Sequence, residues 1–90
     1  MLTVSESAGA RLAHKLDKKQ VAADIAMRFV RDEQRSGWTI RPDRARPEDV
    51  TFAHSGRTVL LLDELASRSL SHRMLDVKVT DEGPRLWFRR

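Results

Sequence analysis

The feature that most constrains the fold is an uninterrupted apolar segment, residues 58–62, that leads directly into a short helical pattern. The segment starts with β-branched side chains and follows the turn-forming residues 54–57, so it predicts a buried strand after a hairpin turn. Asp63 can accept a hydrogen bond from a backbone amide of the turn that it opens. Apolar side chains at near-helical spacing over residues 63–70 then predict a helix of one or two turns.

A second strand is predicted directly after this helix. Residues 74–79 alternate, with Leu75, Val77 and Val79 on one face and Asp76 and Lys78 on the other. A period of two is typical of a strand with one buried face. The C-terminal half of the chain is therefore expected to run strand, helix, strand.

This order, a strand ending in Asp63, a short helix and a further strand, resembles the HesB/IscA family of A-type iron–sulfur carriers. Residues 2–12, a Leu-Thr followed by a small-residue helix, and residues 47–52, an acidic turn into a hairpin, are similar to the same family. The resemblance implies an α+β fold in which residues 1–90 form a single HesB-like domain. That domain would be compact and mainly β, with an N-terminal helix and a short helix between strands.

The residues with which this family binds iron are missing. Its carriers hold a cluster or iron with one cysteine after an early strand and a Cys-Gly-Cys near the C-terminus, whereas this chain has no cysteine and ends without a counterpart of that tail. Against the family's Cys-Ser-Gly, Ser36 and Gly37 match and Arg35 stands in place of the thiolate. A guanidinium repels iron and favours a carboxylate, a phosphate or a carbonyl. We therefore expect no metal, no cofactor and no family ligand residue.

The N-terminal half gives weaker signals. Thr3 and Glu6 stand in a capping-box relation, which predicts a helix starting there and ending near Lys18. Residues 21–31 fit both a helical and a strand period. The pattern alone favours a helix and the resemblance implies a strand, so we predict a strand over residues 26–31 and leave the helix as the alternative.

Four further expectations complete the predicted elements. Residues 37–41 are expected to form a strand with Trp38 and Ile40 on one face. Residues 41–49 are expected to form a loop, because two prolines disfavour regular pairing. Residues 81–84 are predicted as a turn and residues 86–88 as a last short strand.

Size and composition point to one folded domain. Ninety residues bury too little surface to be divided into two cores, and 40% hydrophobic with 33% charged residues is typical of a soluble protein. The longest apolar run is far shorter than a membrane span, so no membrane association is expected. No export signal is recognised at the start of the sequence, which predicts a cytoplasmic protein.

No catalytic residues are predicted. The three histidines, His14, His54 and His72, are scattered without metal-ligand spacing. The acidic pairs 48–49, 63–64 and 81–82 each stand at a turn or helix start, where carboxylates are favoured for local hydrogen bonds. Neither a nucleophile motif nor a glycine-rich phosphate loop is present. We therefore predict that the protein is not an enzyme.

The candidate binding residues are Arg31, Arg35 and Trp38. In the HesB/IscA family this neighbourhood holds a ligand, so the two arginines and the indole could bind an anion or a carboxylate of a partner. The alternative is that Trp38 fills the core opposite Phe52.

The sequence thus predicts a non-catalytic, cysteine-free HesB/IscA-like domain that binds a protein partner or a small ligand and is compatible with homo-oligomers. A net charge of +4 makes a basic nucleic-acid-binding protein the alternative. Acidic residues interrupt the basic loop at residues 41–49, and no base-stacking motif is present. We therefore expect nucleic acid to bind only weakly and without sequence preference.

Overall fold

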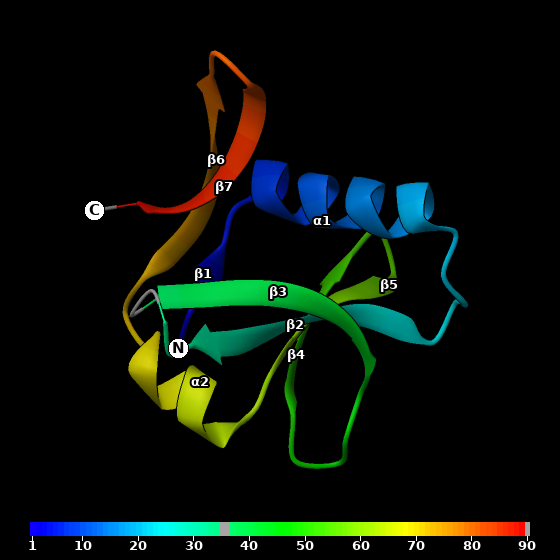
Figure 1. Ribbon diagram of the computed structural model, residues 1–90. Helices are drawn as coiled ribbons and strands as arrows, with labels where there is room; N and C mark the ends of the chain where they lie inside the picture. The colour runs from blue at the N-terminus through cyan, green and yellow to red at the C-terminus, as the bar shows by residue number, and fades with distance from the viewer. Residues whose placement is uncertain (35–36, 90) are drawn as a thin grey trace.

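The computed structural model describes residues 1–34 and 37–89, within which the chain forms two helices and seven strands (Figure 1). The strands form a four-stranded sheet of order β3-β2-β5-β4 and a three-stranded sheet of order β1-β6-β7. This is the predicted α+β fold, mainly β with an N-terminal helix and a short helix between strands. In chain order the elements are β1 (Thr3–Val4), α1 (Glu6–Lys19), β2 (Ile25–Asp32), β3 (Gly37–Arg44), β4 (Val50–His54), β5 (Arg57–Leu62), α2 (Glu64–Ser69), β6 (Met74–Thr80) and β7 (Gly83–Arg89).

Strand β5 is the centre of the fold, as its apolar sequence predicts. It lies between β2 and β4 and contacts both helices, with α1 and α2 on opposite sides in Figure 1. Because both of its faces are covered, β5 is apolar at every position from Val59 to Leu62 rather than alternating. The preceding turn places Ser55 and Gly56 at positive φ, the backbone that a tight hairpin requires.

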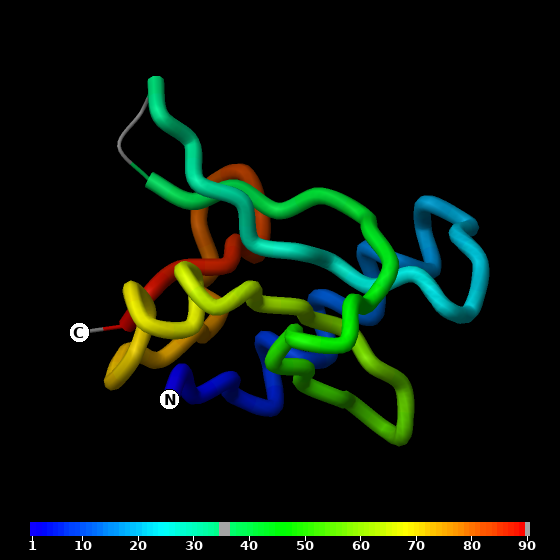
Figure 2. Tube along the Cα trace, turned by 90° about the horizontal axis from the view of Figure 1, so that it is seen from below, coloured from blue at the N-terminus to red at the C-terminus, as the bar shows by residue number. Residues whose placement is uncertain are grey.

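The core lies where both helices and both sheets meet. Its members share exposures of a few per cent or less and come from α1, α2, β2, β5, β6 and the N-terminal segment. Met74 of β6 pairs with Thr3 of β1 on one side and with Arg89 of β7 on the other. Strand β6 therefore lies between the first and the last strand of the chain (Figure 2). The largest buried core side chains are Leu12, Leu16, Met27, Leu60, Leu62, Leu70 and Leu75.

Helix α1 begins later than the capping box predicts. Ser5, not Thr3, is the N-cap: its Oγ accepts a hydrogen bond from the Ala8 N–H at 3.1 Å and donates one to Asp76 at 2.7 Å. Thr3 instead belongs to β1, where its N–H donates to the Arg73 carbonyl at 2.9 Å. The pairing of β1 with β6 is a non-local contact, and it keeps the chain extended until Val4.

The strand predicted over residues 26–31 is confirmed as β2, and the helical alternative is wrong. The predicted loop over residues 41–49 is wrong at its start, because β3 continues to Arg44 and Pro42 stands opposite Met27. Proline is tolerated there because β3 is an edge strand with one side free of ladder partners. The same holds for Pro84, which was predicted in a turn but lies in the edge strand β7 opposite Val79.

The helix predicted over residues 63–70 and the strand predicted over residues 74–79 are confirmed within a residue. Asp63 caps α2 by accepting a hydrogen bond from the Ala66 N–H at 2.8 Å, and β6 occupies the second predicted strand. Strand β7 is longer than its three predicted residues and begins at Gly83. Neither of the described helices has the length and apolar character needed to cross a membrane.

We expect Leu62→Ala to lower the free energy of unfolding by about 2–5 kcal/mol, because Leu62 is fully buried in the core. The matched control is Val79→Ala, since Val79 is 85% exposed on β6 and its truncation should change stability by no more than about 0.5 kcal/mol. Urea unfolding followed by circular dichroism measures both. Similar midpoints for the two variants would contradict the central position of β5.

Candidate functional site

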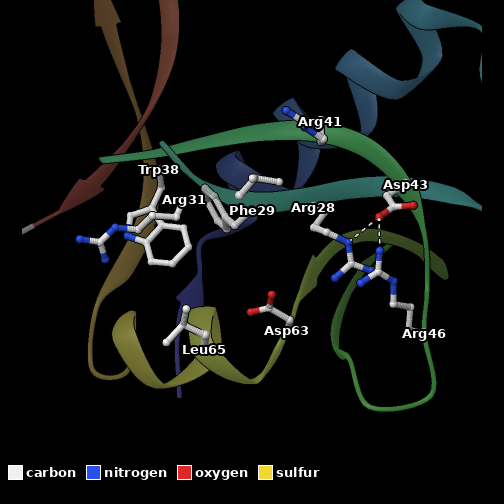
Figure 3. Close-up of a pocket in the computed structure, with 10 residues that line it drawn as sticks. Arg28, Phe29, Arg31, Trp38, Arg41, Asp43, Arg46, Asp63 and Leu65 are labelled. Atoms are coloured by element: carbon white, nitrogen blue, oxygen red, sulfur yellow. Dashed lines mark hydrogen bonds and ion pairs between the residues drawn. The ribbon is translucent and has the colours of Figure 1, made fainter. Parts of the chain in front are cut away.

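A cleft of about 260 Å³ opens between the β2–β3 hairpin and α2 and is called here the Trp38 cleft (Figure 3). Its walls come from β2, β3 and the start of α2, and Leu65, 63% exposed, forms an apolar lip. It brings together two of the three predicted binding residues, Arg31 and Trp38. The third, Arg35, lies outside the described residues. The lining residues are Arg28, Phe29, Val30, Arg31, Trp38, Arg41, Asp43, Arg46, Asp63 and Leu65.

Arg31 and Trp38 face each other as cross-strand partners of β2 and β3. The guanidinium carbon of Arg31 lies 5.5 Å from the centroid of the indole ring, a cation–π distance. Trp38 also meets Phe29 edge to face, with ring centroids 6.5 Å apart and planes at 77°. Trp38 therefore packs on the core with one part and lines the cleft with another. Its aromatic partner is Phe29 and not the predicted Phe52, because Phe52 lies on β4, at the opposite edge of the sheet from β3.

The floor of the cleft contains a buried ion-pair network that the sequence analysis missed. Arg28 is 5% exposed, and its Nε donates to Asp43 Oδ2 at 2.7 Å. Its Nη1 and Nη2 donate to the two oxygens of Asp49 at 2.9 and 2.5 Å, and Nη2 also donates to the Arg44 carbonyl at 3.1 Å. A guanidinium buried in a sheet is tolerated only when such partners satisfy it.

The network raises the pKa of Arg28 above its ordinary value, mainly through the hydrogen bonds to Asp49. The Arg28 guanidinium in turn lowers the pKa of Asp49, whose side chain is fully buried. The pKa of Asp43 is also lowered, first by the hydrogen bond from the Arg44 N–H and then by Arg28. Both carboxylates are thus held in their charged form.

The same carboxylates fix the connection from β3 to β4. Asp49 Oδ2 accepts a hydrogen bond from the Arg46 N–H at 2.7 Å, which is the local turn role that its sequence position suggests. The ion-pair partner of Asp49 is Arg28, which lies 21 residues earlier in the sequence, on β2. The only sequence signal was a charged residue within an otherwise apolar stretch of β2, and that signal does not say which acid pairs with it.

The remaining charges of the cleft decide what it can bind. Arg28 uses its donors on Asp43, Asp49 and a carbonyl, and Arg46 approaches Asp43 at 3.5 Å. Arg31 and Arg41 form no ion pair with any residue in the ranges 1–34 and 37–89. The cleft therefore offers positive charge beside an aromatic ring and an apolar lip.

Proton transfer is not suggested by the lining residues. Asp63 accepts the capping hydrogen bond of α2 and Asp43 accepts from Arg28 and from a backbone N–H, so both carboxylates already serve structural roles. No histidine lines the cleft.

Residues that could hold an iron–sulfur cluster are missing from the described part of the chain. The sequence has no cysteine, and residues 1–34 and 37–89 contain no group of three or more histidine, aspartate or glutamate side chains that could hold a metal. His54 lies 3.6 Å from Glu6 through its Nδ1 and packs against α1 instead. Clusters are held by thiolates, so this donor set does not fit one.

The fold is that of the A-type iron–sulfur carriers, as the sequence resemblance implies. The structure is similar to that of SufA from Escherichia coli, described as involved in the biosynthesis of iron–sulfur clusters, with a TM-score of 0.77 and 16% identity over 98% of this chain and 83% of SufA. It is also similar to IscA with its [2Fe–2S] cluster, with a TM-score of 0.62 and 18% identity over 99% of this chain and 84% of IscA. No protein-family model and no curated protein sequence matches the chain.

We expect Asp49→Asn to lower the free energy of unfolding by about 3–5 kcal/mol, because it leaves the buried Arg28 short of a counter-charge. Asp24→Asn is the control, since Asp24 and its partner Arg44 are both mostly exposed and their pair contributes little. Urea unfolding at neutral pH tests the difference. Equal midpoints for Asp49→Asn and Asp24→Asn would show that the network is not structural.

The same network predicts a dependence of stability on pH. The folded-state pKa values of Asp49 and Asp43 lie below the ordinary value of about 4, so their stabilisation is complete above that pH and is lost as the pH falls through the lower folded values. The wild type should lose stability more steeply below about pH 4 than Asp49→Asn. Urea midpoints measured between pH 6 and pH 2 would reveal parallel curves if this were wrong.

Anaerobic incubation with iron and sulfide should leave the protein without a bound cluster, because thiolate ligands are missing from the sequence. The measurement is visible absorbance after desalting, with a cysteine-containing A-type carrier as the positive control. Stoichiometric charge-transfer bands that persist through desalting would contradict the expectation.

Proposed function

We propose that this chain is a non-catalytic binding module built on the A-type carrier fold, in which the Trp38 cleft recognises a carboxylate of a partner. The observation that carries the proposal is the Arg31 guanidinium, which lies over the Trp38 ring and has no carboxylate partner among residues 1–34 and 37–89. The link to iron–sulfur cluster biogenesis rests on fold similarity alone.

The contact between Arg31 and Trp38 suits anion binding. A guanidinium donates its hydrogen bonds in its own plane, and a cation–π contact does not use these donors. The contact with Trp38 also restricts the rotamers of Arg31, which reduces the entropy lost when a ligand binds. A carboxylate can accept two parallel hydrogen bonds from such a fork.

The size and lining of the cleft favour a ligand the size of a side chain. A volume of about 260 Å³ lies below the range of typical cofactor pockets, which begins at about 300 Å³. Trp38 and the exposed Leu65 would contact an apolar body, while Arg31 and Arg41 offer positive charge to its anionic end. A short apolar group that ends in a carboxylate, as on the surface or at the end of a partner chain, matches this combination.

N-acetyl-leucine and its neutral amide test the proposal in a Trp87→Phe background, in which Trp38 is the only tryptophan. At constant ionic strength the acid should change the Trp38 fluorescence in a saturable way and the amide should not. Arg31→Gln should weaken binding by about tenfold or more, because a hydrogen bond to a charged group contributes about 1.5–3 kcal/mol.

Arg68→Gln is the matched control, because Arg68 is exposed on α2 and pairs with Glu64 outside the cleft lining. It removes the same charge and should leave the titration unchanged. Equal responses to acid and amide, or an Arg31→Gln variant that binds as the wild type does, would refute the carboxylate site.

A further inference from the structure

A second hollow, larger than the Trp38 cleft, lies between the β3 edge of one sheet and the β7 edge of the other. It has a volume of about 830 Å³ and is called here the β3–β7 slot. Four successive residues of β3, 37–40, and five successive residues of β7, 84–88, line it. Both views of the chain show β7 passing near the beginning of β3 (Figures 1 and 2).

The lining pattern shows that the slot is bordered by strand edges. Side chains of a strand alternate between its two faces, so a wall made of successive residues includes the backbone itself. Strand β3 ends the four-stranded sheet and β7 ends the three-stranded sheet, and within residues 1–34 and 37–89 each has only one strand partner. Each edge therefore turns backbone N–H and C=O groups without ladder partners toward its free side.

The slot is also strongly basic. Arg11 and Lys15 stand one turn apart on α1, Arg73 and Arg85 add two further cations, and the single lining acid, Glu82, already pairs with Arg85. The pKa of Lys15 is lowered by burial and then by Arg11 and the other cations around it. The part of this lowering that comes from the neighbouring cations reflects their mutual repulsion, which an anionic ligand would relieve.

Two buried donors of the slot lack acceptors. Arg11 Nε and Trp87 Nε1 are inaccessible to solvent and have no hydrogen-bond partner among the described residues. Both residues line the slot. A buried N–H without an acceptor is unfavourable, and a rotation of either side chain on binding would bring its N–H to a carbonyl or carboxylate oxygen of the ligand.

We propose that the β3–β7 slot binds an acidic peptide in extended conformation, which adds as a strand to the edge of β7 or β3 while its carboxylates meet Arg11, Lys15 and Arg73. Backbone pairing supplies affinity in this mode and alternate side chains supply specificity. The proposal rests on the proposed function only in that it takes the chain as a binding module. None of the charged residues of the slot lines the Trp38 cleft.

A peptide fits the slot better than a nucleic acid does. Single-stranded nucleic acids bind by stacking bases on free aromatic faces. Here Arg73 lies over the Phe88 ring at 4.8 Å, and Lys78 lies over the Trp87 ring at 4.9 Å. Phe29 also packs against Phe88, with ring centroids 5.6 Å apart. Unpaired strand edges, in contrast, match the backbone of a peptide and not that of a nucleic acid.

The test is a fluorescence-anisotropy titration with a labelled eight-residue peptide that alternates glutamate with valine. A second peptide of the same sequence carries N-methyl groups on every backbone amide, which removes the N–H donors of both strand edges and keeps the charge. We expect saturable binding of the first peptide and at least tenfold weaker binding of the second. Equal binding of the two peptides, or no binding of the first, would overturn strand addition.

Matched variants locate the site. Arg11→Gln combined with Lys15→Gln should weaken peptide binding at least tenfold, whereas Lys18→Gln with Lys19→Gln, the same charge change on the same helix, should not. Urea unfolding checks that both double variants fold. Peptide binding that Arg31→Gln abolishes and the Arg11 and Lys15 changes leave intact would overturn the slot and move the peptide to the Trp38 cleft.

Two further readouts separate the remaining outcomes. Amide hydrogen exchange of residues 85–88 or 37–40 should slow when the peptide binds, and unchanged exchange in both strands would contradict the proposal. An oligothymidylate of equal charge should bind more weakly than the peptide, and tighter binding would make the slot a nucleic-acid site. Because the N-acetyl-leucine titration reports on Trp38 and Arg31, its failure would refute the carboxylate site alone.

Discussion

The buried guanidinium of Arg28 is the interaction on which the middle of the structure depends. It stands opposite Leu61 of β5 and Arg41 of β3, in the most enclosed part of the four-stranded sheet. A positive charge there is compatible with folding only because two carboxylates and a carbonyl surround it. In meeting that need, Asp43 and Asp49 bind β3 and the β3–β4 connection to β2, and Arg28 and Asp43 line the Trp38 cleft.

The parts of the fold that follow from local sequence were predictable, and those that depend on distant partners were not. Asp63 caps its helix within three residues, so the strand, helix and strand of the C-terminal half could be located from periodicity and capping alone. Thr3 was misassigned because its partner, Arg73, lies at the other end of the chain. Pro42 was assigned to a loop, but a proline can stand in an edge strand. The sequence alone does not show that β3 lies at the edge of its sheet. The lining of the Trp38 cleft divides in the same way, since Arg31 and Trp38 were named from the sequence and Arg28 with its carboxylates was not.

The fold does not need the iron chemistry of its structural neighbours. Buried apolar side chains from α1, β2, β5, α2 and β6 form the core, and none of them is a cysteine. A sequence without cysteine can therefore keep the architecture of SufA and IscA at 16–18% identity. Around Trp38, by contrast, arginines and aromatic rings line two hollows, one beside α2 and one beside β7.

The two prolines in edge strands bear on how the protein behaves at high concentration. Pro42 and Pro84 each remove a backbone donor from an exposed edge, of β3 and of β7 respectively. Arg85 of β7 and its cross-strand partner Lys78 of β6 add positive charge beside the β7 edge. Natural sheets use these devices to prevent edge-to-edge polymerisation. Two copies of this chain would bring like charges together at such an edge, whereas an acidic strand would not. In the proposed mode of binding, the same devices would oppose pairing between two copies of the chain and still admit a strand of opposite charge.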